Sequence, residues 1–290
     1  MLQINASIAL HKERIWCAYR TQHLFKFDAK SFIAELNTGF DPLSIKRLVA
    51  ENGNTAFEDV RLFSAGDLLL AFYTYFPYAP GGGWEWKFGV GLGIVDEETG
   101  VIKTQISLRH LGRRTHEKNW SPYIVEGEIF MITDYDPFIR VIKIGNMTGA
   151  FNTHEVYVSF LKTKGWKYGE LRGGTPLLQK PNSRDGFFYG FVHSYLVNEK
   201  GFKRYYYYTA VRFEHASKKM DFYPEPLSYE DDRPDASYEL LWKYSNNKSI
   251  KVIFPIGIMH HEDGVMVSFG KDDVASFTQY FTWDLITNLF

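Results

Sequence analysis

The stretch EDVRLFSAGDLLLAFYTY, residues 58–75, contains the unit that decides the fold. A short strand-like segment leads into the polar turn SAGD, and a strongly apolar segment follows, which is the pattern of a β-hairpin. The same arrangement recurs four more times along the chain, in residues 6–20, 118–135, 173–194 and 254–271. Further strand-like runs lie between the copies, so the chain consists of one repeated β unit.

Five such units predict an all-β fold, a five-bladed β-propeller with a central axial pocket. One blade cannot cover its own apolar faces, and its neighbours must do so. No linker rich in Pro and Ser divides the chain, so we expect one domain over residues 1–290. A β-sandwich or two small β domains are the alternative architectures. The one segment that favours a helix is DAKSFIAEL, residues 28–36.

The composition narrows the class of protein. Aromatic residues make up 17% of the 290 residues, and aromatic rings suit both strands and clefts in which a flat ring stacks on a pyranose. A net charge of −1 provides no electrostatic footprint for nucleic acid or an anionic membrane. Cys17, the one cysteine, cannot form an internal disulfide, and neither a signal peptide nor an apolar run of membrane length is evident. We therefore expect a cytoplasmic protein.

Polar residues stand at corresponding places in the units. If the first strand of each unit is innermost, the starts of these strands converge on the propeller axis together with the ends of the second strands. The starts carry Glu58, Asp59, Arg61, Lys118, Asn119, Arg172, Gly174 and Thr175, and the ends carry Asp134, Asp136, His193, Lys271, Asp272 and Asp273. Carboxylates, cations and a histidine from separate blades in one region predict a binding or catalytic site.

Four motifs in a fixed order carry a family resemblance. They are Glu58-Asp59-Val60-Arg61, Lys118-Asn119-Trp120-Ser121-Pro122, Gly173-Gly174-Thr175-Pro176 with the later His193, and Phe254-Pro255-Ile256-Gly257 with the later Phe269-Gly270-Lys271-Asp272-Asp273. This set resembles glycoside hydrolase family 130, the mannoside phosphorylases and mannosidases, and the related glycosyltransferase family 108. Those families are five-bladed propellers, so the resemblance implies the same fold.

The resemblance implies that Asp59 is the general acid that donates a proton to the glycosidic oxygen. A carboxyl group partly buried among aromatic rings can hold a proton for this purpose. The alternative is that Asp59 pairs with Arg61 or caps a turn. Arg61, Lys118, Asn119 and His193 would position the sugar or an anionic leaving group, and the other substrate-binding candidates are Glu58, Arg172, Gly174, Thr175, Lys271 and Asp272.

Two departures from the family pattern disfavour phosphorolysis. The family binds phosphate with two arginines, whereas Lys118 stands at the first place and Asp136 stands near the second. A lysine lacks the planar fork of arginine, and a carboxylate repels phosphate. A second carboxylate, Asp136 or Asp273, instead suits an inverting hydrolase or a transferase.

Asp134-Tyr135-Asp136 spells D-x-D, a pattern that holds a divalent metal in many nucleotide-sugar transferases. Three-letter patterns arise often by chance, so we expect no cofactor. The expected partner is a carbohydrate, as a free glycan, a sugar phosphate or a nucleotide sugar, and neither nucleic acid nor a membrane. A non-catalytic propeller that binds glycan or protein is the alternative function.

Overall fold

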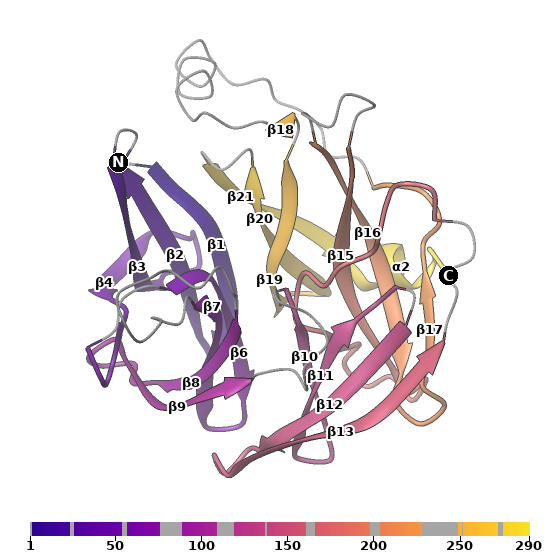
Figure 1. Cartoon of the computed structure of the whole chain (residues 1–290), viewed down its shortest axis with the longest axis horizontal. Helices are drawn as coiled ribbons and strands as arrows, with labels where there is room; N and C mark the ends of the chain where they lie inside the picture. The colour runs from indigo at the N-terminus through magenta and orange to yellow at the C-terminus, as the bar shows by residue number, and fades with distance from the viewer. Residues whose placement is uncertain are drawn as a thin grey trace, which may run out of the picture.

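The strands of the computed structural model form five sheets that follow one another around a ring (Figure 1). The structure describes residues 2–23, 26–53, 57–75, 89–108, 119–136, 138–160, 166–197, 204–227, 249–250, 252–271 and 275–290. Within each sheet, consecutive strands pair antiparallel, and only the short strands β5 and β18 pair parallel. The predicted five-bladed β-propeller is confirmed.

Each blade is one sheet. The strands β1, β6, β10 and β19 lie toward the centre of the ring (Figure 1). Blade 1 contains β1 (Leu2–His11), β2 (Arg14–His23), β3 (Lys26–Leu36) and β4 (Pro42–Arg47). Blade 2 contains β5 (Val49–Ala50), β6 (Phe57–Ala65), β7 (Leu68–Tyr75), β8 (Gly89–Val95) and β9 (Val101–Leu108). Blade 3 contains β10 (Ser121–Val125), β11 (Glu128–Asp134), β12 (Phe138–Asn146) and β13 (Phe151–Phe160). Blade 4 contains β14 (Leu178–Gln179), β15 (Phe187–Val197), β16 (Arg204–Glu214), β17 (Lys219–Phe222) and β18 (Ser249–Ile250). Blade 5 contains β19 (Ile253–His261), β20 (Gly264–Lys271) and β21 (Ala275–Thr282), and the helix α2 (Trp283–Thr287) follows it.

The helix expected at residues 28–36 is wrong. This segment lies within β3, which pairs with β2 on one side and with β4 on the other. Both flanking strands supply hydrogen-bond partners along β3, so pairing within the blade overrides a local preference for helix. In the described part of the chain, no helix is long and apolar enough to cross a membrane.

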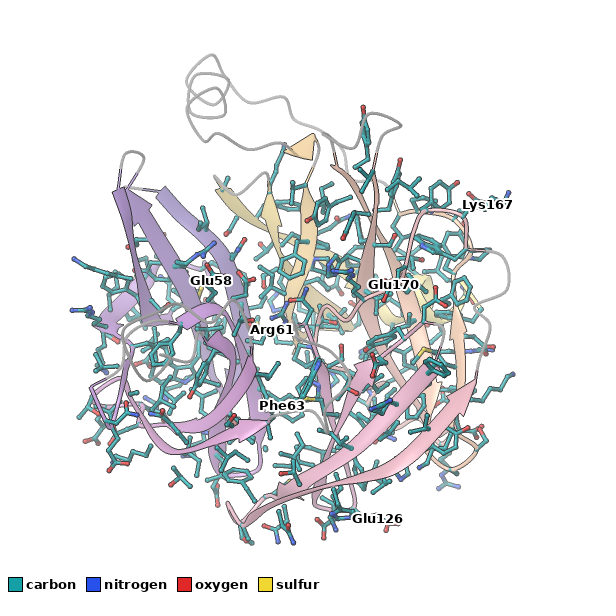
Figure 2. All side chains as sticks on the ribbon, viewed as in Figure 1. Glu58, Arg61, Phe63, Glu126, Lys167 and Glu170 are labelled. Carbon is teal, nitrogen blue, oxygen red and sulfur yellow. The ribbon has the colours of Figure 1, made fainter. Side chains whose placement is uncertain are left out.

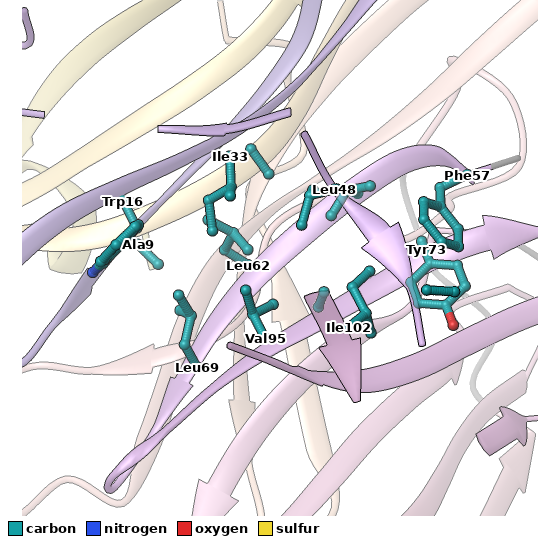
Figure 3. Packing of buried hydrophobic residues seen from close by; sticks show 14 residues of the cluster. Ala9, Trp16, Ile33, Leu48, Phe57, Leu62, Leu69, Tyr73, Val95 and Ile102 are labelled. Atoms are coloured by element: carbon teal, nitrogen blue, oxygen red, sulfur yellow. The ribbon is translucent and has the colours of Figure 1, made fainter. Parts of the chain in front are cut away.

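Five hydrophobic clusters fill the five junctions between neighbouring blades. Between blades 1 and 2, Trp16 and Ile33 pack against Leu62 and Val95 (Figure 3). Similar clusters lie between blades 2 and 3, 3 and 4, and 4 and 5. The cluster between blades 5 and 1 has only four buried members, Ile8, Ile15, Cys17 and Met259. The ring therefore closes through apolar packing, because no blade covers its own faces.

The inner strands share a local irregularity near their starts. The pairing register shifts at residues 4–7 in β1, at 58–61 in β6 and at 255–257 in β19. Such bulges bend a strand and redirect its side chains. They occur at the same end of the three strands, and this end of the propeller is where the candidate site lies.

Candidate active site

Three acidic or amide side chains occupy equivalent places on blades 1, 2 and 3. Asn5, Asp59 and Asn119 have φ values of 56°, 51° and 67°, in the left-handed region, which Asn and Asp tolerate better than other non-glycine residues. All three are buried, with exposed fractions of 6%, 7% and 4%. A small polar residue or Arg61 stands two positions later, as Ser7, Arg61 and Ser121. The bulges of β1 and β6 bring Asn5 and Asp59 to the axial end, where Asn119 precedes β10 with the same left-handed backbone.

Arg61 is the residue on which four blades meet. Its Nη1 donates to the carbonyl oxygen of Asp59 (3.0 Å), its Nη2 donates to Oδ1 of Asn119 (2.8 Å) and its Nε donates to the carbonyl oxygen of Gly174 (2.9 Å). The ring of Phe254 on blade 5 lies 5.1 Å from the guanidinium carbon. Figure 2 shows Arg61 near the centre of the molecule, whereas Glu126, in the turn between β10 and β11, lies at its edge.

The carboxyl group of Asp59 is held on one oxygen by blade 1. Nδ2 of Asn5 donates to Oδ1 of Asp59 over 2.6 Å, and Asp59 also raises the pKa of the nearby Arg61 through its charge. The buried carboxyl group of Asp59 suits the predicted acid, and the hydrogen bond from Arg61 to Asp59 corresponds to the alternative prediction, that the two residues pair. The hydrogen bond from Arg61 goes to the backbone carbonyl of Asp59, and the charge of the Asp59 carboxyl acts on Arg61 as well.

The electrostatics around Arg61 are dominated by burial. Burial lowers the pKa of Arg61 from 12.5 to about 10, and the charges of Asp59 and Tyr135 oppose this shift. Tyr135, which follows β11, is itself buried, and burial raises the pKa of its phenol well above 10. Glu58 lies beside the cluster, where its carboxylate accepts from Nη1 of Arg20 over 2.9 Å. A positive group with little water around it thus lies next to the Asp59 carboxyl.

The Gly173-Gly174-Thr175 segment is shaped by close approach of backbones. A Cβ atom on Gly173 would lie 1.7 Å from the carbonyl oxygen of Asn119, and one on Gly174 would lie 2.3 Å from that of Phe191. Thr175 locks the segment to β15, since its Oγ1 accepts from the N–H of Phe191 over 2.9 Å. Gly173 lets blade 4 come this close to blade 3, and Gly174 lets the segment pack closely against β15 of its own blade, which explains the two consecutive glycines.

His193 reaches the same region from the second strand of blade 4. Its ring packs edge-on against Phe254 with centroids 4.6 Å apart, and it is stacked on Tyr206 at 6.0 Å. Its backbone pairs with Arg172 in a two-way bridge, and the guanidinium of Arg172 lies over Tyr195. Phe254 therefore joins His193 to Arg61, and through Arg61 to Asp59 and Asn119.

The remaining predicted site residues either have other neighbours or lie outside the residues that the structure describes. Asp134 faces Arg140 on the neighbouring strand, with its Oδ2 3.4 Å from Nε. Asp136 follows the buried Tyr135 and is partly exposed, as is Lys271 at the end of β20. Lys118, Asp272 and Asp273 lie outside the described residues. No group of three or more His, Cys, Asp and Glu side chains suited to a metal occurs within the described residues.

Sequence reasoning missed the contribution of blade 1. Asn5, which contacts Asp59, was not among the candidates, although Asn5-Ala6-Ser7 in the first unit corresponds to Asn119-Trp120-Ser121 in the third. Aligning Ser7 with Arg61 and Ser121 would have placed Asn5 beside Asp59 and Asn119. Phe254 was missed as a site residue because an aromatic ring in an apolar segment is indistinguishable from a core residue until its neighbours are known.

Comparison with solved structures shows the same fold in carbohydrate-active enzymes. The β-1,2-mannobiose phosphorylase of Listeria innocua has a TM-score of 0.63 at 11% identity, with 100% of this chain and 92% of that chain covered. MPT-1 of Leishmania mexicana, a GDP-Man-dependent mannosyltransferase, has a TM-score of 0.63 at 13% identity, with 97% and 86% covered. A structure reported with GH130 glycoside hydrolases that target β-1,2 mannosidic linkages in Candida mannan has a TM-score of 0.62 at 13% identity, with 98% and 85% covered.

No family model and no curated protein matches the chain by sequence. The structural likeness therefore supports the fold alone. The three neighbours are described as a phosphorylase, a transferase and hydrolases, so the fold by itself is compatible with three reactions, and the residues must distinguish them.

Proposed function

We propose that this chain is a carbohydrate-active enzyme that makes or breaks a mannoside-like glycosidic bond with inversion, as a glycosyltransferase or glycoside hydrolase rather than as a phosphorylase. The observation that carries the proposal is the Asp59 carboxyl group, buried at the axial end and contacted by Asn5 over 2.6 Å. Structural neighbours with the same fold that act on mannosides support the choice of substrate class.

In the proposed reaction, Asp59 donates its proton to the glycosidic oxygen as the bond to the anomeric carbon breaks. Water or an acceptor hydroxyl attacks that carbon from the opposite face and loses a proton to a second carboxylate, for which Asp136 and Asp273 are the candidates. A single displacement of this kind inverts the anomeric configuration. With a nucleotide sugar as donor, Asp59 would give its proton to the departing diphosphate oxygen, and the acceptor's proton would be taken by the second carboxylate.

The cations of the site disfavour phosphorolysis. Arg61 donates to Asp59, Asn119 and Gly174, so three of the five N–H groups of its guanidinium already have partners in the protein. Asp136 adds negative charge where the resemblance expects an arginine, and a carboxylate opposes phosphate binding. We therefore propose that this side of the site binds the sugar and not phosphate.

The test offers three reactions to the same preparation. β-1,2-Mannobiose alone would release mannose if the chain is a hydrolase, β-1,2-mannobiose with phosphate would yield mannose 1-phosphate if it is a phosphorylase, and GDP-mannose with an oligomannoside would release GDP if it is a transferase. We expect hydrolysis or transfer, and Asp59→Asn should lower its rate by about 10²–10⁴-fold, the usual contribution of a general acid. Asn favours the left-handed conformation as Asp does, so the backbone is preserved.

A matched control is Asp185→Asn, on an exposed turn before β15, which should retain the wild-type rate. Formation of mannose 1-phosphate as the main product would contradict the preference against phosphorolysis. Turnover of none of the three would favour a non-catalytic glycan- or protein-binding propeller, and an unchanged rate in Asp59→Asn would refute the role of Asp59 as the acid.

A further inference from the structure

Asn5 is the side chain that contacts the carboxyl group of Asp59 from another blade. Asn5 lies in the bulge of β1, where the pairing register with β2 shifts between Ile4 and Ser7. Its left-handed backbone directs the side chain across the junction between blades 1 and 2, and its Nδ2 donates to Oδ1 of Asp59 over 2.6 Å, between residues 54 positions apart. The amide of Asn5 is thus presented by the tertiary fold and not by the chain segment that carries Asp59.

The orientation of this amide is constrained on its other side. A Cβ atom on Gly270 of β20 would lie 2.3 Å from Oδ1 of Asn5, so blade 5 closely approaches the amide oxygen. Rotating the amide by half a turn would instead direct its oxygen at Asp59, where it would repel the ionised carboxylate, since both groups are acceptors. In the observed orientation, blade 1 presents an N–H to Asp59 and blade 5 packs against the amide oxygen.

A nitrogen donor has a definite chemical consequence for a carboxyl group. An amide N–H can donate to an oxygen that carries a free lone pair, but it cannot accept a proton. While the contact persists, Oδ1 is the unprotonated oxygen, so a proton on Asp59 has to reside on Oδ2. Hydrogen bonds to the ionised form also favour that form.

We propose that Asn5 is a positioning residue for Asp59: its amide assigns the transferable proton to Oδ2 and limits the pH range over which that proton is retained. The proton assignment follows from the contact itself, whereas its catalytic use rests on the proposed function. Of the described groups, Arg61 on β6 interacts electrostatically with Asp59 and with Tyr135 after β11, and the ion pair of Glu58 with Arg20 lies beside Asp59 on β6 and β2.

Two substitutions at position 5 test the role of the side-chain amide while both tolerate the left-handed backbone. Asn5→Asp is nearly isosteric and retains the tolerance for a left-handed backbone, but it presents an acceptor to Asp59 in place of the donor. Asn5→Gly removes the side chain and also tolerates the conformation. Asn152→Asp adds the same charge on the exposed edge strand β13 and is the matched control. Thermal unfolding establishes that each variant is folded.

The first measurement is the titration of the Asp59 carboxyl carbon by NMR, assigned by its disappearance in Asp59→Asn. We expect the midpoint to rise in both Asn5 variants, by about one pH unit or more in Asn5→Asp, and to stay at the wild-type value in Asn152→Asp. One pH unit corresponds to a tenfold change in the proton equilibrium. Equal midpoints in wild type and both Asn5 variants would overturn the inference, whatever the enzyme activity.

The second measurement is the pH dependence of kcat/KM with the substrate that the three-reaction test identifies. An acid catalyst must be protonated, so activity declines on the alkaline side, and this decline should move to higher pH in the Asn5 variants. A lower kcat with KM changed by less than about threefold is expected as well, because the proton donor is misplaced while sugar contacts remain. The two failures are distinguishable. If the titration midpoint of Asp59 shifts in the Asn5 variants but turnover does not depend on Asp59, the proposed function is refuted and the role of Asn5 in proton placement stands.

Discussion

Replacing Arg61 by methionine tests whether one buried guanidinium connects four blades. Methionine has a similar length and can keep contact with the ring of Phe254, but it donates no hydrogen bonds. Three acceptors on Asp59, Asn119 and Gly174 would lose donors that now lie at 2.8–3.0 Å. Leaving one buried acceptor unsatisfied costs about 2 kcal/mol, so the three together cost about 6 kcal/mol.

A compensating gain reduces this cost. Burial lowers the pKa of Arg61 to about 10, which means that the folded protein opposes the charged form by about 3 kcal/mol. The variant no longer bears this penalty. The free energy of unfolding should therefore decrease by about 3 kcal/mol in Arg61→Met.

Urea unfolding followed by tryptophan fluorescence measures this change, and Arg14→Met provides the control. The side chain of Arg14 is 43% exposed and forms ion pairs with Glu97 and Glu35, and exposed pairs contribute less than about 1 kcal/mol. If Arg61→Met is within 1 kcal/mol of wild type, or if Arg14→Met is equally destabilised, the central role of Arg61 is refuted.

The remaining predictions concern other parts of the fold. Gly173→Ala should lower the free energy of unfolding by more than about 3 kcal/mol, because its Cβ would overlap the carbonyl oxygen of Asn119 at 1.7 Å. A well-folded variant with the wild-type urea midpoint would contradict this prediction. Burial lowers the pKa of His11, His215 and His260 below 6.5, so the unfolded chain binds more protons than the folded one below pH 6.5, and the free energy of unfolding should decrease as the pH falls from 7 to 5.5. A urea midpoint that is constant over this range would argue against it. Burial also raises the pKa of the Cys17 thiol to about 12, so native protein should react with a disulfide reagent at least tenfold more slowly than protein in denaturing urea.

Much of the fold could be read from local patterns. The hairpins of all five units have their apolar segments in the strands and their polar turns between them, and the sheets follow this order. The segment at residues 28–36 is the exception, because its helical character is a weak local preference, whereas β2 and β4 determine its conformation through pairing. The strand signal in the sequence is a short run of apolar residues bounded by turn residues, because inner strands such as β6 and β19 are buried on both faces.

The candidate site was only partly predictable, because its contacts join residues that are far apart in the sequence. Asp59, Arg61, Asn119 and His193 were identifiable from their equivalent places in the units, and Arg61 does bring Asp59 and Asn119 together. Asn5 was not identified, because its amide contacts Asp59 across 54 residues and a blade junction. A side chain's partner at that distance depends on how blades pack, which the sequence of either segment does not contain.

By itself the sequence determined the repeat, the hairpin strands of the five units, and several of the polar residues near the starts of the inner strands, since all of these depend on periodicity and turn chemistry within about twenty residues. The tertiary structure alone decided that Arg61 donates to Gly174, 113 residues away, and that Asn5 faces Asp59. Such contacts arise when five separately formed sheets close into a ring, because the shared apolar junctions, and not the polar groups, set the distances between blades.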